Sequence, residues 1–243
     1  MELRPGLRRV GNEIVACYLF IDDRGVTLVD AGLAGHYHEL LDELTAAGRS
    51  VDDLRAVILT HGDTDHIGFA ERLRRDHGVP VHVHEADAAR ARGEEKPAAT
   101  SFGRGVRPWP LVRFFAYAAV KGGAKTEYLA DVRTVADGVR LDLPGSPVIV
   151  GMPGHSPGSI AVHSPDLDAV CVGDALTTRH VLTGRRGPAP APFTDEPDAA
   201  LDSLDRLAAI DATWVLPGHG TPWDGGTADA VRLVREAAAA SVR

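Results

Sequence analysis

The chain alternates short apolar runs, which predict β-strands, with segments whose leucines and alanines recur at helical spacing. Glycines, prolines and aspartates separate these segments, as expected of turns. This order of strands and helices is typical of an α/β domain. We predict strands at residues 15–21, 26–29, 56–59, 79–83, 139–143, 148–150, 160–163, 169–174 and 214–216, and helices at 38–47, 68–76, 197–209 and from about 227.

Two segments break this pattern within what we expect to be a single domain over residues 1–243. Between about residues 88 and 130, glycine, proline and arginine dominate around the richest aromatic patch of the chain, 109–117. An irregular stretch of that length inside a compact domain is usually functional, so we predict an insertion that forms a cap or lid. Residues 177–192 are predicted to be a second irregular loop.

The composition narrows the classes of function. A chain of 243 residues, 44% of them hydrophobic, can bury one large core. The formal net charge is −8, and Arg185 with Arg186 is the one basic pair late in the chain, which argues against a nucleic-acid partner. Arginine outnumbers lysine by 23 to 3 amid abundant alanine, glycine and proline, which indicates a high-GC bacterial genome.

The cysteines and the apolar runs bear on the cellular compartment. Cys17 and Cys171 each lie in an apolar, strand-like run, so we expect two buried free thiols rather than a disulfide. No apolar stretch is long enough to span a bilayer, and residues 1–10 carry arginines without an apolar signal core. We therefore expect a cytoplasmic protein without a membrane partner.

Four candidate metal ligands fall within six residues directly after a predicted strand: His61, Asp63, Asp65 and His66. On an extended loop the first three alternate along one side, so they can converge on one cation. His66, at the entrance of the following helix, turns toward a neighbouring point. One loop could therefore serve two metal ions. Its position at the carboxyl end of a strand is where α/β folds place their sites.

Three further candidate ligands recur in the same context, after an apolar strand and among glycines: His155, Asp174 and His219. Glycines permit tight turns that leave such a side chain projecting from the strand end. Each residue alone has an ordinary explanation, because a strand-end aspartate often caps a helix and a single histidine is usually packed and hydrogen-bonded. All seven residues together favour a metal centre.

These motifs resemble the metallo-β-lactamase superfamily in sequence, order and spacing. The resemblance rests on the segments THGDTDHIG (60–68), PGHSPGS (153–159), VGD (172–174), LPGHG (216–220) and LVDAG (28–32), and it covers nearly the whole chain apart from residues 88–128. It implies an α/β (α+β) fold in the form of a four-layer αββα sandwich. It also implies two divalent metal ions, with Zn²⁺ expected first.

The resemblance implies a role for each candidate ligand. The first metal would be held by His61, Asp63 and His155, the second by Asp65, His66 and His219, and Asp174 would bridge the two. Water held between the metals would be deprotonated near neutral pH and attack a carbonyl carbon or a phosphorus atom. Asp65 would be the catalytic residue that orients this hydroxide. Asp30 and Thr60 would support ligands rather than bind metal.

Asp63 departs from the family pattern, which usually has histidine at this position. Four neutral imidazoles and three carboxylates leave two divalent ions with a net charge of +1, against +2 for the usual five and two. A harder oxygen ligand also moves the preference from zinc toward manganese or iron. Replacing Asp63 by histidine is expected to restore the common ligand set and shift the preference back to zinc.

Two other functions stay open. A carboxylate at position 63 resembles the flavodiiron branch of the superfamily, whose di-iron chemistry with oxygen is redox rather than hydrolytic, although those proteins need a flavin-binding domain for which this chain has no room. The other alternative is a catalytically silent member that binds a ligand or partner. Hydrolysis is favoured over a silent member because all seven ligand positions carry competent donors.

The substrate is expected to be a small intracellular ester, thioester or lactone with an apolar portion that fits the cap. Glyoxalase II-like thioesterases continue into a helical glutathione-binding region, whereas 24 residues follow His219 here. Acyl-homoserine lactonases carry a tyrosine soon after the bridging aspartate, and this sequence has none after Tyr128. A second copy of the chain is the other partner we consider. The expected substrate contacts are Trp109, Phe115, Tyr117 and His180.

Overall fold

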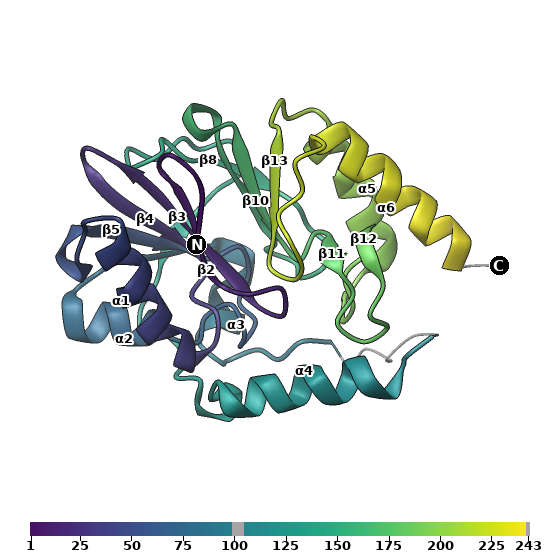
Figure 1. Ribbon diagram of the computed structural model, residues 1–243, viewed down its shortest axis with the longest axis horizontal. Helices are drawn as coiled ribbons and strands as arrows, with labels where there is room; N and C mark the ends of the chain where they lie inside the picture. The colour runs from purple at the N-terminus through teal and green to yellow at the C-terminus, as the bar shows by residue number, and fades with distance from the viewer. Residues whose placement is uncertain (99–104, 242–243) are drawn as a thin grey trace.

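The computed structural model describes residues 1–98 and 105–241, which fold into two β-sheets flanked by helices (Figure 1). The larger sheet has the strand order β1 (Glu2–Arg4), β2 (Leu7–Gly11), β3 (Ala16–Asp22), β4 (Gly25–Val29), β5 (Leu54–Ile58), β6 (Val81–His84) and β7 (Arg133–Val135). The smaller sheet has the order β13 (Trp214–Pro217), β10 (Ala169–Gly173), β9 (Ile160–Ser164) and β8 (Val148–Gly151). A separate hairpin pairs β11 (Thr177–Arg179) with β12 (Arg186–Ala189). The helices are α1 (Tyr37–Ala46), α2 (Ala70–His77), α3 (Ala88–Ala91), α4 (Pro108–Val120), α5 (Pro197–Ala208) and α6 (Thr227–Ser241).

Three apolar clusters define the layers of the molecule. Between the sheets, Phe20 of the larger sheet packs in one cluster with Val162 of the smaller sheet. The outer face of the larger sheet packs against α1 and α2, which contribute Leu40 and Leu73. The outer face of the smaller sheet packs against α5 and α6, which contribute Leu204 and Val234. The predicted four-layer αββα sandwich is therefore confirmed.

The structure differs from the sequence prediction in several segments. The strands β1, β2 and β7 were not predicted. Residues 139–143 form no strand, and Arg140 makes only an isolated bridge. Residues 177–192 were expected to be irregular but contain the β11–β12 hairpin. Residues 108–120 were also expected to be irregular but form α4. Apolar residues occur on every side of α4, so its sequence lacks the amphipathic period by which a helix is detected.

The carboxyl ends of strands from both sheets meet on one side of the sandwich. Strands β4 and β5 are parallel neighbours in the larger sheet. In the smaller sheet β10 is parallel to β13, and β8 has the same direction because β9 is antiparallel to both of its neighbours. The loops that follow these strands carry all seven candidate ligands. The topology thus brings together residues that are far apart in the sequence.

Two smaller expectations concern the cysteines and the membrane. Cys17 and Cys171 are buried free thiols, as predicted. Within residues 1–98 and 105–241, no helix combines the length and the apolar character needed to cross a bilayer.

Candidate metal centre

The seven candidate ligands form three overlapping groups at the strand ends. Within each group the potential ligand atoms lie within 4.8 Å of one another. The groups are His61 with Asp63 and His155, His61 with His66 and Asp174, and Asp65 with His66 and His219. The first and third groups share no residue, and the second group joins them. We call the first group the first metal position and the third group the second metal position.

Four buried polar atoms of this cluster have no hydrogen-bond partner within the described residues. They are Nε2 of His61, Nε2 of His66, Nε2 of His155 and Oδ1 of Asp174. Buried polar atoms are nearly always paired in native proteins, so four unpaired atoms in one cluster call for a ligand. Imidazole nitrogens and carboxylate oxygens suit zinc, manganese or iron. The residues present therefore fit a metal centre.

Asp30 and Thr60 orient two of the histidines. Asp30 follows β4 with a φ of 61°, a left-handed conformation that aspartate adopts more readily than most residues. Its carboxylate accepts hydrogen bonds from N–H of Thr60 at 2.7 Å and from Oγ1 of Thr60 at 2.9 Å, and lies 2.9 Å from Nδ1 of His66. Oγ1 of Thr60 lies 3.0 Å from Nδ1 of His61. Both histidines are thus held through Nδ1, which leaves Nε2 toward the centre.

The other two histidines are held in the same way. Nδ1 of His155 lies 3.3 Å from Oγ1 of Thr194, and Nδ1 of His219 contacts the carbonyl oxygen of Ile14. Nε2 of His219 lies 3.2 Å from Oδ2 of Asp174. All four imidazoles therefore present Nε2 to the same small volume.

The carboxylates of the cluster stabilise positive charge among the histidines. Burial alone would lower the pKa of His66, but the carboxylates, Asp30 first, raise it to about 10. Burial likewise opposes protonation of His219, but Asp174 and Asp65 raise its pKa to about 9. Burial would raise the pKa of Asp174, and the neighbouring histidines, His219 first, instead hold it well below its usual value. Protons or metal ions can supply the positive charge that these carboxylates stabilise.

Two buried residues that sequence reasoning did not single out lie directly after β6. Asp87 accepts hydrogen bonds from N–H of Gly62 at 2.8 Å, from Oγ of Ser156 at 2.7 Å and from N–H of Gly158 at 2.7 Å. It thus connects the ligand loops after β5 and β8. Arg90 donates to Asp63. Their position after β6 could have identified them. Because β6 pairs in parallel with β5, the loop after β6 must adjoin the ligand loop after β5.

A cavity of about 570 Å³ adjoins the centre. Asp63 and Asp65 line it on the metal side, while the wall includes Phe114 and Phe115 of α4 and Phe193. The side chains of Asp63 and Asp65 are 15% and 21% exposed, whereas the four histidines are buried. The accessible side of the centre therefore faces an apolar cavity.

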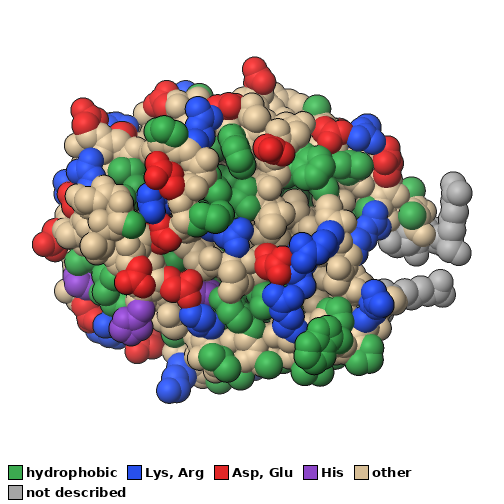
Figure 2. All heavy atoms as spheres, viewed as in Figure 1, with side chains coloured by type: hydrophobic (Ala, Val, Ile, Leu, Met, Phe, Trp, Pro, Cys, Tyr) green, Lys and Arg blue, Asp and Glu red, His purple; other side chains and the backbone are tan. Residues whose placement is uncertain are grey.

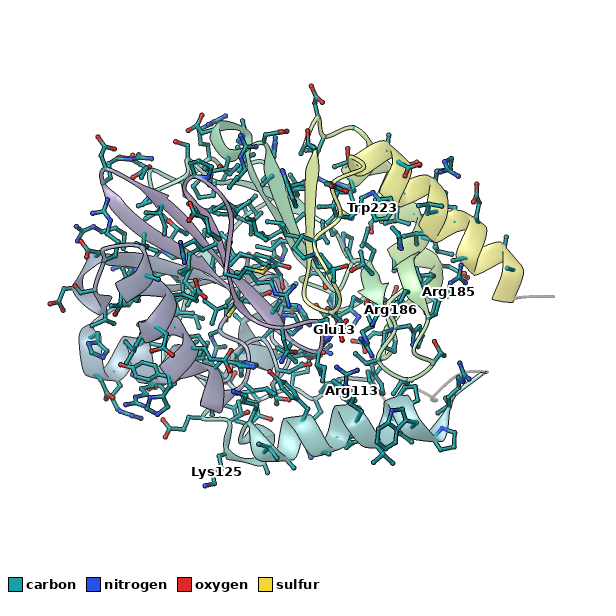
Figure 3. The ribbon with its side chains drawn as sticks, viewed as in Figure 1. Glu13, Arg113, Lys125, Arg185, Arg186 and Trp223 are labelled. Atoms are coloured by element: carbon teal, nitrogen blue, oxygen red, sulfur yellow. The ribbon has the colours of Figure 1, made fainter. Side chains whose placement is uncertain are left out.

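Polar contacts fix helix α4 beside the centre. The hydroxyl of Tyr117 accepts a hydrogen bond from Nδ2 of Asn12 at 2.9 Å and lies 2.7 Å from Nε2 of His36. Arg113 donates to the carboxylate of Glu13 at 3.0 Å, and Figure 3 shows both side chains between α4 and the strands above it. These contacts hold the cavity wall in place.

The four predicted substrate contacts lie in different surroundings. Phe115 lines the cavity, whereas Trp109, Tyr117 and His180 are not among its described lining residues. Trp109 is 75% exposed, and Figure 2 shows hydrophobic side chains along the lower edge of the molecule, where α4 lies. Tyr117 points to Asn12 and His36, and His180 lies at the start of the turn between β11 and β12. Substrate contact stays a prediction for these residues.

Comparison with known proteins identifies the family. The family model of the metallo-beta-lactamase superfamily matches residues 10–219. The chain belongs to this superfamily. It is 29% identical to "Probable metallo-hydrolase YflN" of Bacillus subtilis (strain 168) over 208 residues, which are 82% of this chain and 76% of that protein.

Two further superfamily comparisons concern chemistry. The chain is 32% identical over 206 residues to hydroxyacylglutathione hydrolase of Ruegeria pomeroyi, covering 83% of this chain and 61% of that protein. The crystal structure of TTHA1623 in a di-iron-bound form matches with a TM-score of 0.61 at 26% identity, covering 90% of this chain and 93% of that one. Family membership together with the His/Asp groups supports a divalent metal site and a hydrolase at the superfamily level.

In this member of the metallo-β-lactamase superfamily, Asp63 lies close to the two histidines with which it was expected to bind the first metal, and its role as a ligand stays a prediction. Its Oδ2 is 3.6 Å from Nε2 of His61 and 3.5 Å from Nε2 of His155. Burial would raise the pKa of Asp63, but His155, His61 and Arg90 hold it far below its usual value. The carboxylate is therefore ionised and directed toward the first metal position.

Proposed function

We propose that this protein is a bacterial, cytoplasmic hydrolase that holds two divalent metal ions, in the first instance Zn²⁺, and cleaves an ester, thioester or lactone bond of a small molecule. One observation carries the proposal. Unpaired Nε2 atoms of buried histidines converge beside two carboxylates that face an apolar cavity. Such a cavity with a few convergent polar groups is the usual form of a small-molecule site.

The three groups support the proposed ligand set. One ion would be held by His61, Asp63 and His155, the other by Asp65, His66 and His219, with Asp174 between them. When bound, the two ions supply an activated water and polarise the bond that is cleaved.

Asp65 is the residue best placed to orient the attacking water and accept its proton. One carboxylate oxygen lies 3.4 Å from Nε2 of His219, and the side chain borders the cavity. The ring of Phe114 lies on the same side, with its centroid 6.1 Å from that of His219. An apolar acyl group that packs against Phe114 would occupy the same cavity that Asp65 lines.

The cavity and one relative support an ester-type bond. Aromatic side chains and alanines of α4 form most of one wall, which suits an acyl chain better than a charged or phosphorylated group. The relative from Ruegeria pomeroyi is by name a hydrolase of hydroxyacylglutathione, which supports an acyl compound as the substrate class.

Di-iron redox chemistry is the second candidate. The carboxylate of Asp63 favours it, because two histidines with one carboxylate are the ligand set typical of non-haem iron sites. The match to TTHA1623 in a di-iron-bound form supports iron as the bound metal, which this candidate needs. Iron in the purified protein, with oxygen consumed when a reductant is added, would establish it over hydrolysis.

The test combines metal counting with a substrate panel. We expect protein purified without chelator to carry close to two metal ions per chain, and to hydrolyse esters, thioesters or lactones faster when their acyl chains are longer. Removing the ions with a chelator should abolish turnover and lower the unfolding temperature, and added zinc should restore both. The proposal would be refuted if the purified protein carried no metal and if its unfolding temperature were the same with and without chelator. Bound metal without turnover of any panel member would favour the silent alternative.

A further inference from the structure

A buried arginine adjoins the centre and also lines the cavity. The side chain of Arg90 is 4% exposed. Its Nε donates to Oδ1 of Asp63 at 2.5 Å, and its Nη1 donates to Oδ2 of Asp195 at 2.6 Å. Because an unpaired buried charge is strongly destabilising, Arg90 depends on these carboxylates. Its helix can approach because residue 62 is glycine, where a Cβ would lie 2.8 Å from the backbone nitrogen of Ala91.

The two carboxylate oxygens of Asp63 contact different groups. Oδ1 accepts the hydrogen bond from Arg90, while Oδ2 faces Nε2 of His61 and Nε2 of His155. Asp63 can therefore offer a single oxygen to a cation between these histidines. The other oxygen neutralises the guanidinium.

Asp195 joins Arg90 to the second histidine of the same group. The N–H of Asp195 donates to the carbonyl oxygen of His155 at 3.1 Å. The preceding residue, Thr194, contacts Nδ1 of His155. Arg90 thus connects the supports of two ligands at the first metal position.

The guanidinium also limits which residue can occupy position 63. Arginine only donates hydrogen bonds. A histidine that binds metal through one ring nitrogen carries an N–H on the other, which is again a donor. With histidine at position 63, two donors would face each other and Arg90 would lose one of its carboxylates. From the sequence, histidine at position 63 was expected to restore the common ligand set. In a chain that contains Arg90, this replacement should instead disturb the first metal position.

We propose that Arg90 is a positioning residue for the first metal position, and that Asp63 and Arg90 act as a pair in place of the single histidine common in the superfamily. Arg90 holds Asp63 as a one-oxygen ligand, offsets its negative charge and ties it to the loop that supports His155. The net charge of +1 that the sequence implied for the metal centre did not include the guanidinium of Arg90. The inference rests on the two-metal function proposed above.

A double-mutant cycle tests the pairing. Zinc affinity at both positions is measured by competition with a chromophoric chelator for the unchanged protein, Asp63→His, Arg90→Gln and the double variant, with circular dichroism to check folding. Each single variant should bind one of its two zinc ions about 10- to 100-fold more weakly. The double variant should regain both, because the Gln carbonyl oxygen can accept the N–H of the new histidine. Arg92→Gln is the matched control, because Arg92 pairs with Glu94 in a more exposed position of the same segment.

The outcomes separate this inference from the proposed function. Unchanged zinc binding by Arg90→Gln, or equal binding by Asp63→His and the double variant, would overturn the role of Arg90. If Arg90→Gln does not fold, Arg90→Lys takes its place, since lysine keeps the charge but lacks the fork that bridges two carboxylates, and unchanged binding would again overturn the role. Absence of zinc from the unchanged protein would instead refute the two-metal function itself.

Discussion

Oδ2 of Asp30 lies 2.9 Å from Nδ1 of His66, and both side chains are buried. The contact fixes the ring of His66 with Nε2 toward the second metal position. Because the carboxylate is charged, it also strengthens the imidazole as a ligand. Asp30 directly follows β4, the parallel neighbour of the strand that leads into the ligand loop, so it acts on the metal position without being one of its candidate ligands.

Replacing Asp30 by asparagine should weaken the second metal position while keeping the fold. Asparagine tolerates the φ of 61° at this position and keeps an oxygen that can accept the hydrogen bond, but it removes the charge. We expect zinc affinity at one position to fall by about 10- to 100-fold. Competition titration measures it, with Asp166→Asn as the exposed control. Equal affinities in the two variants would contradict this role of Asp30.

The stability of the metal-free protein should fall as the pH rises. The pKa values of His66 and His219 are raised to about 10 and about 9 in the folded protein, against about 6.5 in an unfolded chain. Their protonation therefore stabilises the fold fully below about pH 6.5, and this contribution is lost as the pH rises through 9 to 10.

Thermal unfolding with and without chelator measures this effect. The unfolding temperature of chelated protein should decrease steadily between pH 7 and 10, whereas the zinc-loaded protein should show a smaller decrease, because metal-bound imidazoles are already neutral. Parallel curves for the two forms would contradict the prediction, because they would mean that protonation of His66 and His219 does not stabilise the metal-free protein.

Phe115→Ala should change substrate choice without changing metal content. Phe115 lines the cavity, so its removal takes away apolar contact with a long acyl chain. We expect kcat/KM to fall about tenfold for long-chain substrates and little for short ones, as the loss of one aromatic contact implies. Val112→Ala is the control, since Val112 lies on the same helix, is 56% exposed and is not among the described lining residues of the cavity. If kcat/KM depends on acyl-chain length in the same way in both variants, Phe115 does not contact the acyl chain.

Tyr117→Phe should loosen α4 while leaving the metals in place. The hydroxyl is the acceptor for Asn12 and a partner of His36, so its loss leaves polar groups beneath the helix unpaired. We expect a decrease of about 1–3 kcal/mol in the free energy of unfolding, measured by urea denaturation. Tyr128→Phe is the comparison, because Tyr128 is 49% exposed. If Tyr117→Phe is as stable as Tyr128→Phe, the hydroxyl does not anchor the helix.

The sequence by itself determined the features that depend on short stretches of chain. Apolar runs of strand length and leucines at helical spacing predicted most elements, because each element buries one face and so repeats its pattern locally. The run from His61 to His66 predicted ligands in the same way, since one loop presents them all. Where the local pattern was absent, as along α4, prediction failed although the helix is thirteen residues long.

Only the tertiary structure decided what surrounds those ligands. Arg90 is 27 residues from Asp63 and 105 residues from Asp195, and no local spacing links the three side chains. They meet because β5 and β6 are parallel neighbours and because the loop before α5 passes beside His155. The cavity has the same origin, since α4 lies against the centre through contacts with Asn12, Glu13 and His36. A ligand motif is a property of one loop, whereas the charge and the shape around it depend on which distant strands and helices pack together.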